Sequence, residues 1–350
     1  MLMVILGAGA SFDSWPGGPP TGTPERDRPP LARDLFDERY APLLNEHRKA
    51  RFAVDRLRAA VKAGADVEQE LEKMRDLADR DSFYHSHLMA IRYYLRDLIG
   101  TTELTWSQEK GGVTNYVRLV GQVREWARDA NEAVCYVTFN YDMLLDRVLE
   151  DQLGLWRGLI DSYVRAPHHL IKFHGSVNWF RLCGPSSIAV FEHTPNISQI
   201  IDRAAELEPT GEVQVWGQEW SRIGATTRQS SLGGPEQIIV PALSIPLQRK
   251  AVAECPTSQL ELLEEVIPQT TRVLIVGWRG AEKHFWNLWK GRVRTDVRVD
   301  VCCGGPDMPD GIAYNCPPIG IELRQINNAQ MTFSALVDGW PSRLQRLLSL

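Results

Sequence analysis

The sequence lacks any apolar run of about 18 residues, the length at which a helix can cross a bilayer. It also lacks the basic flank and the small-residue cleavage site that would make a signal peptide of its first apolar residues, Met1 to Leu6. These two absences predict a cytoplasmic protein that does not associate with a membrane.

Cysteine pairs at metal-binding spacing are missing too. The chain has six cysteines and none forms a Cys-x-x-Cys pair, so a structural zinc ribbon has no ligands at the expected separation. His85 and His87, at i and i+2, point to different sides of a helix, which is poor geometry for a metal. We predict no metal, and we expect Cys135, Cys302 and Cys303 to be ordinary core residues.

Positive charge is not in excess. The net charge is -5 and the sequence pI is about 6.0, which argues against a surface built for phosphate backbones and against direct binding of nucleic acid. With 350 residues, 43% of them hydrophobic, the chain can bury a substantial core. We therefore expect one large domain with an insertion, or two domains.

Four short segments carry the strongest positive signal. Each joins a short apolar run to glycine or polar residues, which is typical of the carboxyl end of a parallel strand, where open α/β sheets bind ligands. The segments are Val4 to Ser11, Thr138 to Asp142, Lys172 to Ser176 and Leu274 to Trp278. Together they indicate a nucleotide site.

In the first segment, Met3 to Leu6 is predicted to be a strand that ends in Gly7-Ala8-Gly9-Ala10-Ser11. Gly7-x-Gly9 allows the tight turn and the close backbone approach that a pyrophosphate needs at a following helix start. Phe12 stands where the third glycine of the dinucleotide motif would fall. A plain glycine turn between strand and helix is the alternative for this segment.

Residues 13 to 30 are rich in Gly, Pro and Thr and are predicted to form a loop that could cover a ligand as a lid. Arg26 and Arg28 either reach a phosphate from it or are solvated loop charges. Helical spacing of apolar residues then predicts a largely helical insertion over residues 32 to 130, which includes a helix from Thr114 to Asn131.

A second strand, Ala133 to Thr138, leads into Asn140 and Asp142 before a helix over 143 to 151. Asn140 can orient a ribose hydroxyl or a water, or it is a turn residue. Asp142 contacts a ligand or caps the helix. A third strand, Leu170 to Phe173, ends at His174, whose ring suits general base work or a hydroxyl hydrogen bond.

The rest of the chain gives a weaker signal. We assign His168 and His169 to a loop. The segment from 181 to 235 is either an insertion or a mixed connecting segment, and Trp216 and Trp220, at i and i+4, could form a helix face that packs on the core or on a partner. Strands are expected at Gln237 to Pro241 and at Val273 to Gly277. The tail over 331 to 350 is expected to be helical, with Pro341 starting its second helix.

The glycine turn, Thr138-Phe139-Asn140-Tyr141-Asp142 and Lys172-Phe173-His174-Gly175-Ser176 occur together in an order and spacing that resemble the sirtuin-like family of prokaryotic NAD-handling proteins. The resemblance implies an α/β fold with a Rossmann-like parallel sheet and a helical insertion after its first strand. It implies a Rossmann-like NAD-binding domain over 1–31 and 131–330, the helical insertion over 32–130 and a C-terminal helical tail over 331–350.

The resemblance also implies roles for particular residues. Asn140 and His174 match the family's catalytic pair, and Asp142 matches a cofactor contact. The remaining contacts to NAD are expected from the two glycine-containing turns and from the end of the late strand: Gly7, Ala8, Gly9, Ala10, Ser11, Gly175, Ser176 and Gly277.

Two departures separate the chain from protein-deacetylating sirtuins. The zinc module with its two cysteine pairs and the Gly-Ile-Pro-Asp-Phe-Arg loop are both absent from the sequence, which disfavours deacylation. In addition, Arg279 and Glu282 stand after the late strand where the family often has Ser and Asp. Arg279 either meets a phosphate or pairs with Glu282.

Members of the family commonly cleave the nicotinamide–ribose bond of NAD as antiviral effectors. The resemblance thus implies an NAD glycohydrolase that releases nicotinamide and ADP-ribose and that serves as a toxic effector of antiphage defence. It further implies a homo-oligomer and a separate activating partner, either an ATPase or an Argonaute-like protein. The alternative is a non-catalytic module that binds NAD or ADP-ribose and regulates a partner.

Overall fold

The structure is a computed structural model. It describes residues 1–16, 28–109, 111–154, 158–184, 195–207, 209, 211–216, 226–228, 237–245, 254–303, 312, 325–339 and 341–349. The chain divides into two compact units, which are described separately. The first comprises Met1–Leu31, Thr102–His174 and Lys250–Leu350, and the second comprises Ala32–Thr101 and Gly175–Arg249.

The first unit contains a six-stranded sheet in which every pairing is parallel. The strand order is β10-β9-β8-β1-β2-β3. The strands are β1 (Leu2–Leu6), β2 (Val134–Thr138), β3 (His168–Lys172), β8 (Arg272–Val276), β9 (Arg298–Cys303) and β10 (Gln325–Gln330). β1, β2 and β3 are buried along their whole length, as in a sheet with both faces covered. The predicted class, α/β with a Rossmann-like parallel sheet, is confirmed.

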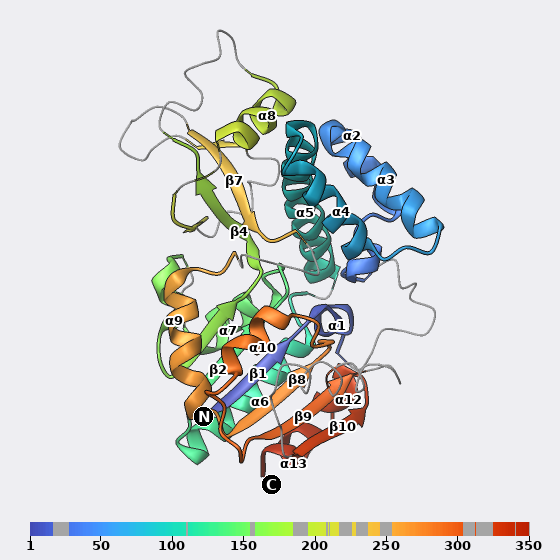
Figure 1. Cartoon of the computed structure of the whole chain (residues 1–350). Coiled ribbons are helices and arrows are strands. Elements are labelled where there is room, and N and C mark those ends of the chain that lie inside the picture. The colour runs from blue at the N-terminus through green and yellow to red at the C-terminus, as the bar shows by residue number, and fades with distance from the viewer. Residues whose placement is uncertain are drawn as a thin grey trace. The chain divides into compact units, whose positions relative to one another are not determined.

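Helices cover both faces of this sheet (Figure 1). On one face, Met3, Ile5 and Val137 pack in a core with α9 (Thr257–Val266) and α10 (Lys283–Trp289). On the other, the guanidinium of Arg272 lies over the ring of Trp126 in α6 (Asn115–Ala130) and donates to the carbonyl of Leu348 in α13 (Arg343–Ser349). Alternate residues of one strand therefore face different helices, as the pleat of a strand requires.

The remaining helices of the first unit are short. α1 (Ala8–Phe12) follows β1, α7 (Leu144–Leu153) follows β2, and α12 (Phe333–Val337) precedes α13. Asn131 at φ 53° and Gly154 at φ 62° end α6 and α7 in the left-handed conformation common at helix C-termini. Within the segment predicted as a helical tail, α12 and α13 are helical, and Pro341 lies two residues before the start of α13.

The second unit holds most of the predicted helical insertion together with a small sheet. Its helices are α2 (Ala41–Glu46), α3 (Arg51–Lys62), α4 (Val67–Ala78), α8 (Ile197–Leu207) and the part of α5 (Ser82–Glu109) up to Thr101. Its sheet has the order β5-β4-β7-β6, with antiparallel pairing throughout. Those strands are β4 (Gly175–Leu182), β5 (Gln214–Val215), β6 (Thr227–Arg228) and β7 (Gln237–Leu243).

Three features differ from the predicted organisation. Residues 175–249, assigned by sequence to the first domain, group with 32–101, so the strand at Gln237 is β7 of the small sheet. α6, assigned to the insertion, packs in the first unit. His168 and His169 are in β3 and not in a loop, because pairing with Val134 and Cys135 extends the strand beyond its apolar run.

Some of the predictions fall partly or wholly outside the described residues. Residues 17–27 of the predicted lid, with Arg26, lie outside them, as does Trp220. The start of that loop is described: the amide of Asn115 donates to the carbonyls of Asp13 and Trp15. Trp216 packs on the ring of Phe180, with the ring centres 4.3 Å apart.

Candidate functional site

The predicted site residues converge because the carboxyl ends of β1, β2 and β3 lie in register. Leu6 pairs with Thr138, and Thr138 pairs with Lys172. Asn140 and His174 therefore stand at equivalent positions, each two residues beyond a paired residue, on strands that neighbour each other. This is the sheet edge at which open α/β folds bind ligands.

The carboxamide of Asn140 is buried, with 6% of the residue exposed, and its orientation is fixed. Its Nδ2 donates to the Gly7 carbonyl at 2.9 Å, to Ser11 Oγ at 2.9 Å and to the Tyr116 hydroxyl at 3.3 Å. Because a carbonyl can only accept, the bond to Gly7 sets which end of the amide is nitrogen. Oδ1 is left buried with no hydrogen-bond partner among the described residues. A buried acceptor in this state has capacity for a donor.

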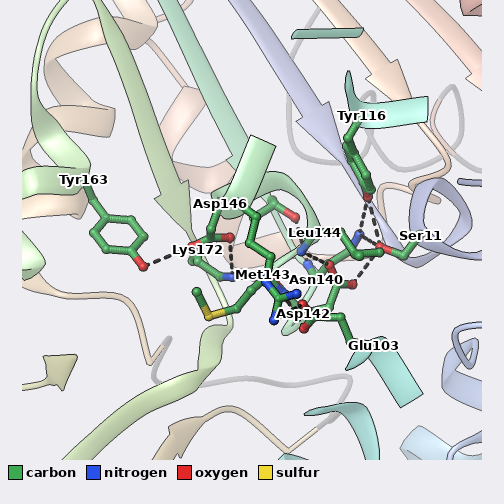
Figure 2. A network of polar contacts seen from close by, with 12 residues as sticks. Ser11, Glu103, Tyr116, Asn140, Asp142, Met143, Leu144, Asp146, Tyr163 and Lys172 are labelled. Carbon is green, nitrogen blue, oxygen red and sulfur yellow. Dashed lines mark hydrogen bonds and ion pairs between the residues drawn. The ribbon is translucent and has the colours of Figure 1, made fainter. Parts of the chain in front are cut away.

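Ser11 joins Asn140 to Asp142 (Figure 2). Its hydroxyl donates to Asp142 Oδ2 at 2.6 Å and lies 3.0 Å from the Tyr116 hydroxyl. Since the Ser11 hydroxyl donates its proton to Asp142, the Tyr116 hydroxyl is the donor to Ser11. The hydrogen bonds therefore run from Tyr116 through Ser11 to the carboxylate of Asp142. The backbone N–H of Leu144 donates to the other oxygen, Oδ1, at 3.1 Å.

Asp142 therefore has both carboxylate oxygens bonded within the protein. One caps the start of α7, as the structural alternative for this residue predicts. Burial raises the pKa of the Asp142 carboxyl, and the Ser11 hydrogen bond opposes that shift. Burial also raises the pKa of Tyr116 well above its usual value, so this hydroxyl stays protonated. The predicted contact between Asp142 and a cofactor remains a prediction.

His174 is buried, with 4% of the residue exposed, and it packs among aromatic rings. Its ring centre lies 5.1 Å from that of Phe139, 6.1 Å from that of Tyr141 and 5.9 Å from that of Phe173. It thus contacts the residues on both sides of Asn140. The sequence pattern indicates only a residue at a strand's end, and the structure adds a substantial packing role.

Glycine residues after β1 and β8 contact each other directly. A Cβ on Gly9 would lie 2.9 Å from the Cα of Gly277, and a Cβ on Gly7 would lie 2.6 Å from the carbonyl oxygen of Gly277. The N–H of Gly9 donates to that same carbonyl at 3.0 Å. Gly277, at φ +62°, would place a Cβ 2.3 Å from the nitrogen of Ala10.

This packing changes the explanation for Gly9. The sequence motif predicts that its missing Cβ makes room for a pyrophosphate, whereas the structure shows that the space next to it is filled by Gly277. The glycines are required for the contact between two turns. Ala8 and Ala10 lie in α1, and Ala10 is fully buried.

Gly175 and Ser176 belong to the second unit, where they begin β4. Gly175 has φ +81°, and a Cβ there would lie 2.1 Å from the carbonyl oxygen of Ala242 in β7. The residue is glycine because β7 approaches this closely. That NAD contacts these two residues remains a prediction.

Arg28 and Arg279 are the described candidates for phosphate contact. The guanidinium of Arg28 lies over the ring of Phe12, 4.7 Å from its centre. Glu282, the alternative partner of Arg279, accepts a hydrogen bond from the indole of Trp278 at 2.6 Å. A phosphate contact of either arginine remains a prediction.

Glu103, Tyr116 and Lys172 are among the residues of the network in Figure 2 that have no role in the sequence-based prediction. Glu103 Oε2 accepts the backbone N–H of Met143 at 2.8 Å. Lys172, fully buried, donates to the carbonyl of Asp142 at 2.6 Å and to Asp146 Oδ2 at 2.8 Å. A polar residue on a helix carries no sequence signal for a partner 24 or 40 positions away. Lys172, a charged residue ending an apolar strand, is the one detectable signal.

Metal-binding clusters and membrane-spanning helices are both absent from the described part of the chain. No group of three or more His, Cys, Asp or Glu side chains within it could hold a metal ion. No helix within it is long and apolar enough to span a bilayer.

Comparisons with known proteins give weak similarities. No protein-family model matches the chain, and no curated protein matches its sequence. A solved structure of a Sir2 homologue in complex with NAD is 14% identical, with a TM-score of 0.40 over 99% of this chain and 89% of that chain. A Sir2 homologue mutant with 2'-O-acetyl ADP-ribose is 12% identical, with a TM-score of 0.40 over 100% of this chain and 93% of that chain. Similarity at this level assigns no activity to the chain.

Proposed function

We propose that the protein is an NAD glycohydrolase that cleaves the bond between nicotinamide and ribose. The observation that carries the proposal is the state of Asn140: its nitrogen is fixed by three acceptors, while its oxygen is buried without a partner among the described residues. A fixed, unpartnered acceptor at the carboxyl edge of a parallel sheet is suited to hold a water or a ribose hydroxyl.

The chemistry assigns one role to each residue of the pair. As the bond between C1′ of the ribose and the pyridinium nitrogen breaks, its electron pair passes to nicotinamide, which leaves as a neutral molecule. Asn140 Oδ1 accepts a hydrogen bond from the water that attacks the oxocarbenium-like C1′. His174 takes the proton that this water loses, or engages a ribose hydroxyl. The products are nicotinamide, ADP-ribose and one proton.

A non-catalytic module that binds NAD or ADP-ribose is the second candidate. It is favoured by the internal bonding of Ser11 and Asp142, whose side-chain oxygens already have partners within the protein. Under either candidate NAD is the ligand, and neither role of Asn140 and His174 needs a metal. Release of nicotinamide separates the two.

We further propose that the activity is a toxic effector function in antiphage defence and that it requires a homo-oligomer and a separate activating protein. The family resemblance of the sequence motifs supports this part. The internally bonded state of Ser11 and Asp142 agrees with a site that needs a trigger to open. NAD cleavage should then rise when the products of neighbouring genes, an ATPase or an Argonaute-like protein, are added.

The test incubates the purified chain with NAD, with and without those neighbouring proteins, and measures free nicotinamide. Asn140→Ala should lower turnover by about a hundredfold or more, because it removes a group that acts on the attacking water. NAD affinity, measured by calorimetry, should largely survive.

Gln152→Ala is the matched control. Its Nε2 also donates to a carbonyl, that of Val117 at 2.8 Å, and its Oε1 also lacks a partner among the described residues, but it joins α7 to α6. Its turnover should stay close to that of the unmodified protein. If no nicotinamide appears under any condition while NAD still binds, the non-catalytic module is the correct function.

A further inference from the structure

Glu103 is a buried carboxyl group that reaches the candidate site from a distant part of the chain. It lies on α5, with 1% of the residue exposed, and its Oε2 accepts the N–H of Met143 at 2.8 Å (Figure 2). Met143 is the N-cap of α7 and follows Asn140, Tyr141 and Asp142 directly. Glu103 therefore holds the turn that carries the proposed water-binding residue.

The other polar groups of this turn are held by nearby residues. The N–H of Asn140 donates to Thr138 Oγ1, the N–H of Leu144 donates to Asp142 Oδ1, and the carbonyl of Asp142 accepts from Lys172. Glu103 holds the backbone of the turn from α5, whereas Ser11 and Tyr116 hold the side chains of Asn140 and Asp142. Loss of this acceptor would leave a part-buried N–H without its partner, which costs free energy.

The charges around Glu103 come from three elements. Arg147 on α7 is 3.4 Å from Oε1, Asp142 lies in the turn, and Lys172 is in β3. With Asp146, which pairs with Lys172, the group has three carboxyls and two cations. Burial raises the pKa of Glu103 to about 8, and Arg147 opposes that shift. With one proton on Glu103, two negative carboxylates face two positive side chains, so this set of five residues has no net charge.

We propose that Glu103 is a positioning residue that sets the geometry of Asn140 by accepting the N–H of Met143. The inference rests on the proposed NAD cleavage for its kinetic consequences, and on the structure alone for the anchor itself. A carbonyl oxygen suffices for this role, so the amide of Gln should replace the neutral acid and Ala should not.

The first experiment compares turnover in Glu103→Ala, Glu103→Gln and the control Gln152→Ala. Glu103→Ala should lower kcat by about tenfold to a hundredfold with a smaller change in KM, because a displaced reacting group affects the chemical step. Glu103→Gln should stay close to the unmodified protein at neutral pH. Above about pH 8, kcat should fall in the unmodified protein, because ionised Glu103 leaves the buried group with one unbalanced negative charge, and Glu103→Gln should not show this fall.

The second experiment measures hydrogen exchange in peptides that cover residues 140–149, which needs no activity. Exchange at the start of α7 should rise in Glu103→Ala and stay unchanged in Glu103→Gln and Gln152→Ala. If the unmodified protein cleaves no NAD, the proposed function fails, while the exchange data still test the anchor. Equal exchange in all variants, or the same fall in kcat above about pH 8 in Glu103→Gln, would overturn the inference. Glu103→Gln also keeps the test decisive if Glu103→Ala does not fold.

Discussion

At the scale of single residues, Asn140 and His174 differ in how their side chains are held. Asn140 is held by hydrogen bonds, whereas His174 is held by aromatic packing. The nitrogen of Asn140 donates to three acceptors, and its oxygen has no partner among the described residues. The nitrogen therefore holds the side chain in place, and the oxygen can accept a hydrogen bond from a ligand. His174 is enclosed by Phe139, Tyr141 and Phe173. A substitution there changes the aromatic packing as well as any proton transfer.

We predict that His174→Ala abolishes NAD cleavage and also lowers the free energy of unfolding by about 1–3 kcal/mol, because it opens a cavity among the rings. His174→Phe refills that space and should recover most of the stability without recovering cleavage. Urea denaturation and nicotinamide release measure the two effects separately. Cleavage by His174→Phe would show that the ring serves packing alone.

At the scale of elements, the glycine turn after β1 is one half of a contact whose other half follows β8. Because β1 and β8 are in register from Leu2 and Arg272 onward, their carboxyl ends meet at the same height. Gly9 and Gly277 then approach so closely that neither has room for a Cβ. The N–H of Gly277 in turn donates to the carbonyl of Cys302 in β9, which extends the contact across three strands.

Gly277→Ala should therefore be far more damaging than Gly291→Ala. Both residues have positive φ, +62° and +75°, and each substitution costs about 1–2 kcal/mol for an L residue in that conformation. At Gly291 the Cβ would meet nothing within 4 Å, whereas at Gly277 it would overlap the backbone of Ala10. We expect Gly277→Ala to lose about 1–3 kcal/mol more in urea denaturation. Equal losses would mean that backbone strain is the whole effect.

At the scale of the whole molecule, the buried carboxyl of Glu103 links stability to pH. Its pKa rises from an ordinary value of 4.5 to about 8 in the folded protein. Between these values the folded chain keeps a proton that the unfolded chain has lost, so stability falls as pH rises. Below pH 4.5 the Glu103 carboxyl is protonated in both the folded and the unfolded chain, and above about pH 8 it is ionised in both. Its contribution to the pH dependence of stability is therefore confined to this range.

Glu103→Gln removes this linkage. Relative to the unmodified protein, its free energy of unfolding should increase by up to about 1.4 kcal/mol per pH unit between pH 4.5 and about 8, and should level off above that. Chemical denaturation of both proteins across the range measures the difference. A constant difference would show that Glu103 ionises with an ordinary pKa in the folded state.

Much of the parallel sheet could be predicted because its strands are short apolar runs with a clear end. Leu2–Leu6 and Val134–Thr138 differ from the predicted strands by one residue at one end. The assignment of His168 and His169 to a loop is wrong because their strand conformation comes from pairing with β2, which no local pattern records. β7 is recognisable as a strand, yet its sheet depends on antiparallel pairing with β4.

The α/β class and the polar residues near the carboxyl ends of β1, β2 and β3 follow from the sequence, because hydrophobic pattern and turn chemistry are local properties. Which of those residues contact each other depends on how the strands and helices pack. The register of β1, β2 and β3 aligns Asn140 with His174, and the turn after β8 fills the space beside Gly9. The anchor from Glu103 to Met143 spans 40 positions, and contacts of that kind arise only when helices and strands pack.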